Sequence, residues 1–453
     1  MRSVDSHLRD HALLDSASMG PTQYRFWLLA SGGTLIDGLS IFSLGIAIPL
    51  MTSRFALGPL MIGLVGSALV LGAVFGAALG GPAADRFGRK PAFLIDMTII
   101  AAGALVSAAA SAPQWVLLGQ LLVGIGIGID FPVSASYVSE TAPKHARSRM
   151  VVATIALQSV GMLLGAAIDL AILRAWSNLA AWRPMIAAVG AAAVIFLLLR
   201  FWLPESQRWL GHRQRGRPAR ASARAPALEH RYAVLLSRRF RTRTTLISLP
   251  WFLMDIATYG VGLFTPVILG AIRFSSDTTG PLAAEFSNAE GTAAIDVFLL
   301  LGFLLGLWAV PRFGRIHMQV AGFVVMTIGM LILLTPQFAA GGAAAHVPIV
   351  FIGFILFNLA MNAGPNATTF GLAPELFPTG IRASAGGFAA AAAKLGATLG
   401  IFILPLVKAR GGVAEVLMMM AVVSALGALA TAILAREVGE IPEGRSIDEA
   451  DTL

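Results

Sequence analysis

Twelve apolar runs of about 20 residues constrain the fold of this chain more than any other feature. They begin near Trp27, Leu60, Pro91, Gln114, Met150, Arg183, Thr244, Thr292, Met318, Val347, Ala383 and Val413. An α-helix needs about 20 residues to cross the hydrocarbon core of a bilayer. The chain has 57% hydrophobic and 13% charged residues and a mean hydropathy of +0.77, which lies outside the range of soluble domains. The sequence therefore predicts an all-α membrane protein with twelve transmembrane helices.

A polar, arginine-rich stretch divides the runs into two sets of six. We expect a cytoplasmic N-terminal tail over residues 1–26, a six-helix bundle over 27–203, a basic cytoplasmic linker over 204–243, a second six-helix bundle over 244–436 and a cytoplasmic C-terminal tail over 437–453. Loops rich in Lys and Arg mark the cytoplasmic side of multi-pass proteins, so the net charge of +9 indicates orientation and not nucleic-acid binding. The first 25 residues lack an apolar core, so we expect no cleaved signal peptide and a location in the inner or plasma membrane.

Two motifs recur at equivalent positions of the two halves. DRFGR at Asp85–Arg89 follows the second run, and PRFGR at Pro311–Arg315 follows the eighth. The pattern E-x-x-P-x-x-x-R follows the fourth run at Glu140–Arg147 and the tenth at Glu375–Arg382. The halves are therefore predicted to be parallel copies of one unit. Charge pairs at these helix ends that form in one state and break in another would suit alternating access. We expect a cytoplasmic gate that comprises Gly81, Asp85, Arg86, Gly88, Arg89, Glu140, Arg147, Arg312, Arg315, Glu375 and Arg382.

Four charged side chains lie well inside the apolar runs, namely Asp37, Asp130, Asp255 and Lys394. On insertion scales each costs roughly 2.5–3.5 kcal/mol at a helix centre, so together they would cost on the order of 10 kcal/mol in lipid. We expect these groups to face one another, water or a ligand. Three further aspartates lie nearer the ends of the runs and are expected to be hydrated: Asp96, Asp169 and Asp296.

One run combines a carboxylate with two aromatic residues on a single helix face. Trp251, Asp255 and Tyr259 are spaced four residues apart, so each is rotated by roughly 40° from the one before it. We expect this face to line a cavity. Lys394 is open to two interpretations, a structural ion pair with an aspartate or a point charge for an anionic substrate. A neutral, protonated carboxyl at Asp255 could donate a hydrogen bond to such an anion, which would couple proton binding to substrate binding.

Five motifs together resemble those of the major facilitator superfamily, and within it the phosphate–proton symporters and their sugar-porter-like bacterial relatives. G-x-x-x-D-R-x-G-R-K at Gly81–Lys90 is similar to the gate signature of the superfamily, and LPESQR at Leu203–Arg208 to the sugar-porter motif. More specific are GIGIDFPVS at Gly126–Ser134, GPNATTF at Gly364–Phe370 and the W-x-x-x-D-x-x-x-Y of Trp251–Tyr259.

The resemblance implies a secondary transporter that imports a small anion with protons by alternating access, and inorganic phosphate is the leading candidate. Phe131 stands where those symporters usually carry a tyrosine, and Gln120 where an arginine usually pairs with the acid at Asp37. By position, the resemblance assigns substrate binding to Gln158, Trp251, Asp255, Tyr259, Asn366 and Lys394, and we expect Phe131, at the tyrosine position, to contact the substrate as well. It assigns proton handling to Asp37 and Asp130, and the hydrogen-bond argument for a protonated carboxyl adds Asp255.

The two departures leave a second transport function open, in which the substrate is a sugar, a carboxylate or an aromatic acid. A third possibility is a nutrient sensor that binds without transporting. The intramembrane acids in both halves and the intact Asp85 motif favour transport. We see no catalytic triad, metal-ligand cluster, P-loop or cysteine in the sequence, so we expect neither an enzyme nor a cofactor, and the proton gradient would supply the energy. The expected partners are an anionic substrate, protons and lipid, without nucleic acid, and we expect a monomer.

Overall fold

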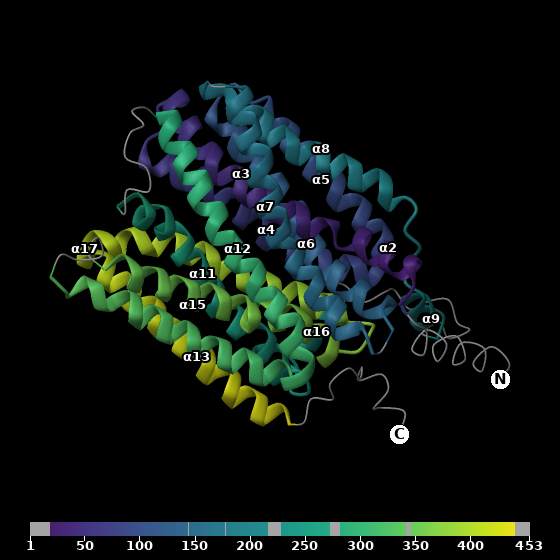
Figure 1. Cartoon of the computed structure of the whole chain (residues 1–453). Helices are drawn as coiled ribbons and strands as arrows, with labels where there is room; N and C mark the ends of the chain where they lie inside the picture. The colour runs from purple at the N-terminus through teal and green to yellow at the C-terminus, as the bar shows by residue number, and fades with distance from the viewer. Residues whose placement is uncertain are drawn as a thin grey trace.

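Two helical bundles lie side by side in the computed structural model, which describes residues 19–143, 145–176, 178–215, 228–271, 281–340 and 346–439 (Figure 1). The first bundle comprises α2 (Pro21–Ala30), α3 (Gly32–Phe55), α4 (Pro59–Phe87), α5 (Arg89–Ala108), α6 (Pro113–Thr141), α7 (Arg147–Ala175) and α8 (Trp182–Arg200). The second comprises α11 (Arg241–Ala271), α12 (Pro281–Phe313), α13 (Arg315–Leu334), α15 (Val347–Ala363), α16 (Pro365–Leu376) and α17 (Arg382–Val438). Two short helices lie in the polar stretch between them, α9 (Gln207–Arg215) and α10 (Leu228–Leu235).

The all-helical membrane architecture predicted from the sequence is confirmed. Nine helices in the described part of the chain are apolar and long enough to cross a bilayer, and α11, α12 and the N-terminal part of α17 occupy the three other predicted spans. The α2–α3 and α15–α16 pairs each form one interrupted span, and α17 contains two spans that meet at Gly412, where φ is +72°. Two boundaries differ, because α12 begins at Pro281 and not near Thr292, and α2 begins at Pro21 and not near Trp27.

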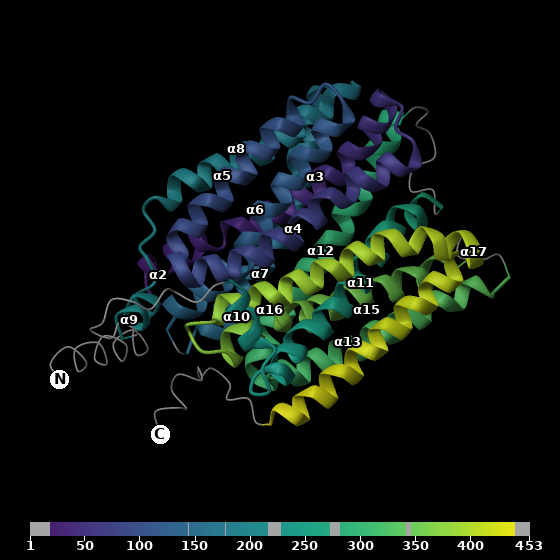
Figure 2. The ribbon, with the colours of Figure 1, turned by 180° about the vertical axis from the view of Figure 1, so that it is seen from behind.

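The packing within each bundle repeats. The contact of α3 with α7 recurs as α11 with α17, that of α4 with α6 as α12 with α15, and that of α5 with α8 as α13 with α17. The bundles then meet through α4 with α17 and through α7 with α12, which are again equivalent pairs (Figure 2). Gly88 and Gly314 occupy matching positions between helices and both have positive φ, at 113° and 82°. The two halves are therefore parallel copies, as the repeated motifs predicted.

Small residues allow α3 and α7 to approach closely enough to bring their polar side chains together. A Cβ atom added at Gly38 would lie 1.9 Å from the carbonyl oxygen of Gln158, and one at Gly161 would lie 1.9 Å from that of Leu35. Such glycine contacts are the usual means by which membrane helices pack tightly. The seam holds Asp37 of α3 beside Gln158 of α7.

Candidate functional site

Lys394 lies among residues of three helices at the junction of the two bundles. Its ammonium group donates to Asp255 Oδ2 at 3.1 Å and to the Tyr259 hydroxyl at 3.2 Å. The side chains of Lys394 and Asp255 are 7% and 3% exposed. A charge that is this well buried needs the hydrogen bonds that these partners provide, because burial without them costs several kcal/mol per ion. The shared face predicted for α11 thus brings Asp255 and Tyr259 to the same cation.

Three aromatic rings pack beside this lysine. Phe131 of α6, Trp251 of α11 and Phe370 of α16 contact one another edge to face, with ring centroids 6.2–6.4 Å apart. The Lys394 Nζ atom lies 5.2 Å from the centroids of both Phe131 and Tyr259, which is within the range of a cation–π interaction. We call these six residues the lysine cluster: Phe131, Trp251, Asp255, Tyr259, Phe370 and Lys394. The cluster combines one buried cation with three aromatic rings that pack on one another.

Asp37 pairs with an amide and not with an arginine. Gln158 Nε2 donates to Asp37 Oδ2 at 2.6 Å, and Asp37 is 2% exposed. Lys394 also acts on Asp37 electrostatically. Gln120, at the position where the family usually has an arginine, donates instead to Ser107 Oγ at 3.3 Å. The departure noted in the sequence therefore leaves Asp37 with a neutral hydrogen-bond donor and a distant cation.

Asn366 belongs to a different local network. The helix is interrupted at Gly364, between α15 and α16, where φ is −111° and ψ is −98°. Asn366 Nδ2 donates to Asn362 Oδ1 at 2.8 Å, and Asn362 Nδ2 donates to the Leu299 carbonyl at 3.0 Å. The geometry thus connects Asn366 to α15 and α12, and no contact described here joins it to Lys394.

Asp130 pairs with an arginine that the sequence analysis missed. Arg200, the last residue of α8, places Nη2 2.7 Å from Asp130 Oδ1 and Nη1 3.0 Å from Asp96 Oδ1. The side chain of Arg200 is fully buried and lies over the ring of Phe93, with Cζ 4.3 Å from the centroid. The available signal was the position of Arg200 within the apolar stretch before Pro204, which requires an internal partner.

The expectation that the aspartates near the ends of spans are hydrated was wrong for two of the three. Asp96 and Asp169 are both fully buried, whereas the side chain of Asp296 lies outside the described residues. Asp96 lies about two turns inside α5, where it faces Arg200. Distance from a helix end does not determine hydration here, because the neighbouring helices of the bundle exclude water.

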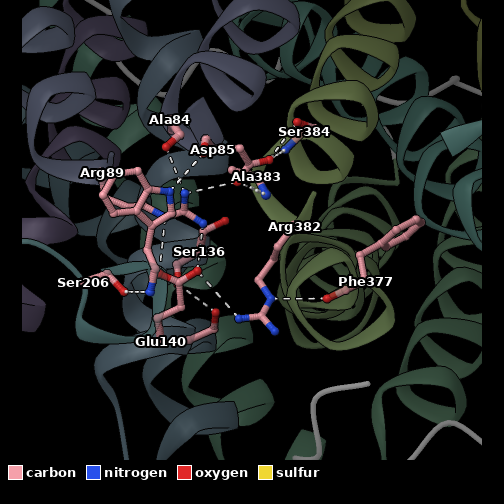
Figure 3. Close-up of polar contacts among 12 residues, drawn as sticks. Ala84, Asp85, Arg89, Ser136, Glu140, Ser206, Phe377, Arg382, Ala383 and Ser384 are labelled. Carbon is pink, nitrogen blue, oxygen red and sulfur yellow. Dashed lines mark hydrogen bonds and ion pairs between the residues drawn. The ribbon is translucent and has the colours of Figure 1, made fainter. Parts of the chain in front are cut away.

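Three predicted gate residues of the first half, Asp85, Arg89 and Glu140, converge where α4, α5 and α6 meet the start of α17 (Figure 3). Arg89 Nη1 lies 3.1 Å from Asp85 Oδ1, and Arg89 Nη2 lies 2.8 Å from Glu140 Oε1. Arg382, from the second bundle, places Nη1 3.7 Å from the same oxygen of Glu140. We call Asp85, Arg89, Glu140 and Arg382 the gate cluster. Its charges join the two bundles at this end of the molecule.

Asp85 also caps the first turn of α17 from the other bundle. Its carboxylate accepts hydrogen bonds from the backbone N–H groups of Ala383 and Ser384, at 3.3 and 2.8 Å, and from the Ser384 hydroxyl at 2.7 Å. An acid at a helix N-terminus satisfies free N–H groups and interacts favourably with the helix dipole. Pro311 has no such carboxylate, so the repeat is chemically asymmetric at this point.

The other predicted gate residues divide into two groups. Arg315 and Glu375 form a buried ion pair at 2.8 Å, the second-half counterpart of Arg89 and Glu140. Arg147 is also buried, at the start of α7. Arg86 and Arg312 are exposed, and their guanidinium groups lie over the rings of neighbouring aromatic residues, outside the gate cluster.

Gly81 permits the contact between α4 and α17. A Cβ atom at this position would lie 2.2 Å from the Ala383 carbonyl oxygen, so Gly81→Ala should oppose closure of the bundles at this end. Overpacking of this kind costs about 1–3 kcal/mol, which would reduce the closed population about 5- to 150-fold. The chain has no native cysteine, so Ala383→Cys introduces a single thiol at this contact. A water-soluble thiol reagent should label it faster when Gly81→Ala is also present than when Gly81 is retained.

Gly45→Ala is the matched control, since a Cβ atom there meets nothing within 4 Å. The thiol of Ala383→Cys should be labelled at the same rate whether position 45 is glycine or alanine. Equal labelling rates in the Gly81 and Gly45 variants would show that the α4–α17 contact does not limit access.

Two parallel helical bundles with ionic clusters where they meet are an arrangement found in many membrane transporters. The family model described as "Sugar (and other) transporter" matches residues 51–442, and the chain belongs to this family. Its members are membrane transporters and not enzymes.

Relatives with different substrates cover most of the chain. The 4-hydroxybenzoate transporter PcaK of Pseudomonas putida is 26% identical over 419 residues, which cover 88% of this chain and 89% of that protein. Inorganic phosphate transporter 1-1 of Oryza sativa subsp. japonica is 28% identical over 451 residues, which cover 86% of this chain and 85% of that protein. The family is therefore clear, whereas the substrate is not determined by similarity.

The solved structures support the same fold. The proton:xylose symporter XylE bound to 6-bromo-6-deoxy-D-glucose superimposes with a TM-score of 0.76 over 95% of this chain and 98% of that chain. The sequence identity is 20%, so this likeness concerns the architecture alone. The major facilitator fold implied by the sequence motifs is confirmed.

Proposed function

We propose that this transporter imports a small anion together with protons and that the anion binds at Lys394. The observation that carries the proposal is the buried ammonium of Lys394, which two residues of α11 hold at the junction of the bundles. A lysine kept only to join two helices would be an expensive structural device, because each buried ion costs several kcal/mol. An anion would complete the coordination of this cation. Inorganic phosphate is the leading substrate, and the similarity to a phosphate transporter supports it.

Protonation of Asp255 would resolve the repulsion between this carboxylate and a bound anion. While Lys394 is paired with Asp255, the ion pair is balanced. An arriving anion competes for the ammonium, and a proton on Asp255 removes the competing charge and provides a hydrogen-bond donor. Proton and anion binding would then stabilise each other, which is the thermodynamic basis of symport. Asp37, held by Gln158 and acted on by Lys394, would contribute to the same coupling.

The gate cluster would close one side of the protein during the transport cycle. Its ion pairs cross between the bundles, so separation of the bundles would break the Arg382–Glu140 pair and the hydrogen bonds of Asp85 to α17. We place this end in the cytoplasm because the basic loops follow the positive-inside rule. The termini would then be cytoplasmic in an inner or plasma membrane, and the protein would act as a monomer.

Uptake into proteoliposomes tests the function directly. Purified protein is reconstituted with a neutral interior, and labelled inorganic phosphate is added outside at acidic or neutral pH. We expect accumulation only with the acidic exterior and its loss on addition of a protonophore, since the inward proton gradient supplies the energy. Phosphate uptake equal to that of empty vesicles would overturn the phosphate assignment, and accumulation that is independent of the gradient would overturn the coupling.

A second candidate substrate is an aromatic carboxylate. The three rings of Phe131, Trp251 and Phe370 favour it, because they provide edge-to-face neighbours for a planar ring beside the ammonium of Lys394. Phe131 also lacks the hydroxyl that the phosphate symporters usually direct at the anion, and the similarity to a 4-hydroxybenzoate transporter supports this candidate. The same vesicles, assayed with labelled 4-hydroxybenzoate, distinguish the two substrates.

A further inference from the structure

A second ionic site lies inside the first bundle, apart from the lysine cluster. Arg200 contacts Asp96 and Asp130, whose side chains are 0% and 2% exposed, so one cation is shared by two carboxyl groups. If both acids were ionised, the site would carry one uncompensated negative charge. An unpaired ion in such a buried place costs several kcal/mol. The geometry therefore leaves room for one additional positive charge.

The arrangement of the carboxyl oxygens indicates where that charge belongs. Arg200 contacts Asp130 through Oδ1, whereas Asp130 Oδ2 is buried and has no hydrogen-bond partner among the described residues. Both carboxyl groups contact the one guanidinium of Arg200, at 3.0 Å for Asp96 and 2.7 Å for Asp130. One guanidinium balances one carboxylate, so the site is neutral only if the two acids hold one proton between them. We propose that Asp96 and Asp130 share a single proton beside Arg200 and that this pair is a proton-binding site of the transport cycle, an inference that rests on the proposed symport.

The surroundings of the pair contain few other charges. Arg200 of α8 is the cation in direct contact, and Asp37 of α3 interacts with Asp130 at longer range. Backbone carbonyls take the remaining donors of Arg200, and the ring of Phe93 covers its face. The two acids therefore have one cation in direct contact, and Arg200 remains charged at all accessible pH values.

The pair is mechanically connected to the first span. Arg200 Nε and Nη2 each donate at 2.9 Å to the carbonyls of Leu29 and Ala30, at the interruption between α2 and α3. The Asp130 carboxylate fits against the next turn, since a Cβ atom at Gly33 would lie 2.0 Å from its carboxyl carbon. Removal of the proton would strengthen the attraction between Arg200 and the two acids. The hydrogen bonds from Arg200 to the carbonyls of Leu29 and Ala30 would change as a result.

That interruption lies two turns before Asp37, the acid that Gln158 holds in the same span. A change in the angle between α2 and α3 would therefore move Asp37 relative to Lys394. This connection explains how a proton inside one bundle could affect an anion bound between the two bundles. The coupling would pass through packed helices, and no direct contact between proton and substrate is needed.

Infrared difference spectroscopy tests the shared proton without any substrate. In the purified native protein, a rise in pH should remove the C=O stretching band of one protonated carboxyl group. This band should be absent from the spectra of both Asp96→Asn and Asp130→Asn. Each substitution leaves one carboxylate balanced by Arg200, so neither variant needs the proton. Asp169→Asn, which also removes a buried carboxyl group, is the matched control and should retain the band. A band that survives in either Asp96→Asn or Asp130→Asn would overturn the proposal.

Transport by the same variants tests the role in coupling. With labelled phosphate, or with 4-hydroxybenzoate if phosphate is not carried, both variants should still exchange internal for external substrate. Accumulation driven by the pH gradient should fall to the level without a gradient, whereas Asp169→Asn should accumulate normally. Undiminished accumulation by Asp96→Asn would show that the pair is only structural. Because the infrared band requires no substrate, failure of the proposed substrate and failure of this inference give different results.

Discussion

Replacement of Lys394 by methionine is expected to abolish anion uptake while the protein remains folded. Methionine preserves the length and apolar stem of the side chain but removes the ammonium that contacts Asp255 and Tyr259. Loss of one partner of a buried, hydrogen-bonded charge pair costs about 2–5 kcal/mol in binding. The smaller figure already weakens binding about 30-fold, at 1.4 kcal/mol per tenfold. Equilibrium binding and vesicle uptake of labelled phosphate and 4-hydroxybenzoate measure the effect.

A second variant tests whether Lys394→Met loses transport because it misfolds. Asp255 loses its cation in Lys394→Met, and the double variant Lys394→Met with Asp255→Asn removes the uncompensated carboxylate as well. We expect both variants to elute as the native protein does on size-exclusion chromatography and neither to transport. Lys394→Arg keeps the charge and should retain part of the binding. Normal uptake by Lys394→Met would exclude an anion site at this residue.

Arg200→Met should cause a larger loss of stability than removal of any single charge in the lysine cluster or the gate cluster. It leaves Asp96 and Asp130 buried without their cation and frees the carbonyls of Leu29 and Ala30. Removal of one partner from a buried ionic network costs about 3–5 kcal/mol. The free energy of unfolding, followed by tryptophan fluorescence during titration with a denaturing detergent, should fall by about that amount.

Two further variants separate charge from side-chain volume. The triple variant Arg200→Met, Asp96→Asn and Asp130→Asn removes all three charges and should recover much of the lost stability, because replacement of a whole buried ionic group is often close to neutral. Arg54→Met makes the same change at an exposed position near the end of α3 and should alter stability by less than about 0.5 kcal/mol. If Arg200→Met were as mild as Arg54→Met, the buried network would not contribute to folding.

The candidate site was only partly predictable. The spacing of Trp251, Asp255 and Tyr259 placed them on one face of a helix, and the structure brings Lys394 to Asp255 and Tyr259. Lys394 was predicted as a buried charge with two possible roles, and its pairing with Asp255 is compatible with both. Phe370 was not predicted as part of the cluster, because an apolar ring in an apolar span gives no signal in the sequence.

The ionic site of the first bundle was less predictable from the sequence than the lysine cluster. Asp130 was predicted to need a partner, but no rule based on sequence identified Arg200, which lies 70 positions away. Asp96 was expected to be hydrated and is fully buried. In both cases the sequence did not show which helix packs next to the aspartate. Periodicity defines the faces of a single helix, but it does not identify the helix that packs against each face.

The sequence by itself determined the membrane location, the two repeated halves and the positions of the intramembrane charges. The lengths of the apolar runs and the cost of a charge in lipid are local properties that can be read along the chain. Only the tertiary structure decided how the charges pair: Lys394 with Asp255, Arg200 with Asp96 and Asp130, and Asp85 with the first turn of α17. The physical reason is that electrostatic partners are selected by distance in space, and that distance is determined by helix packing between segments remote in the sequence.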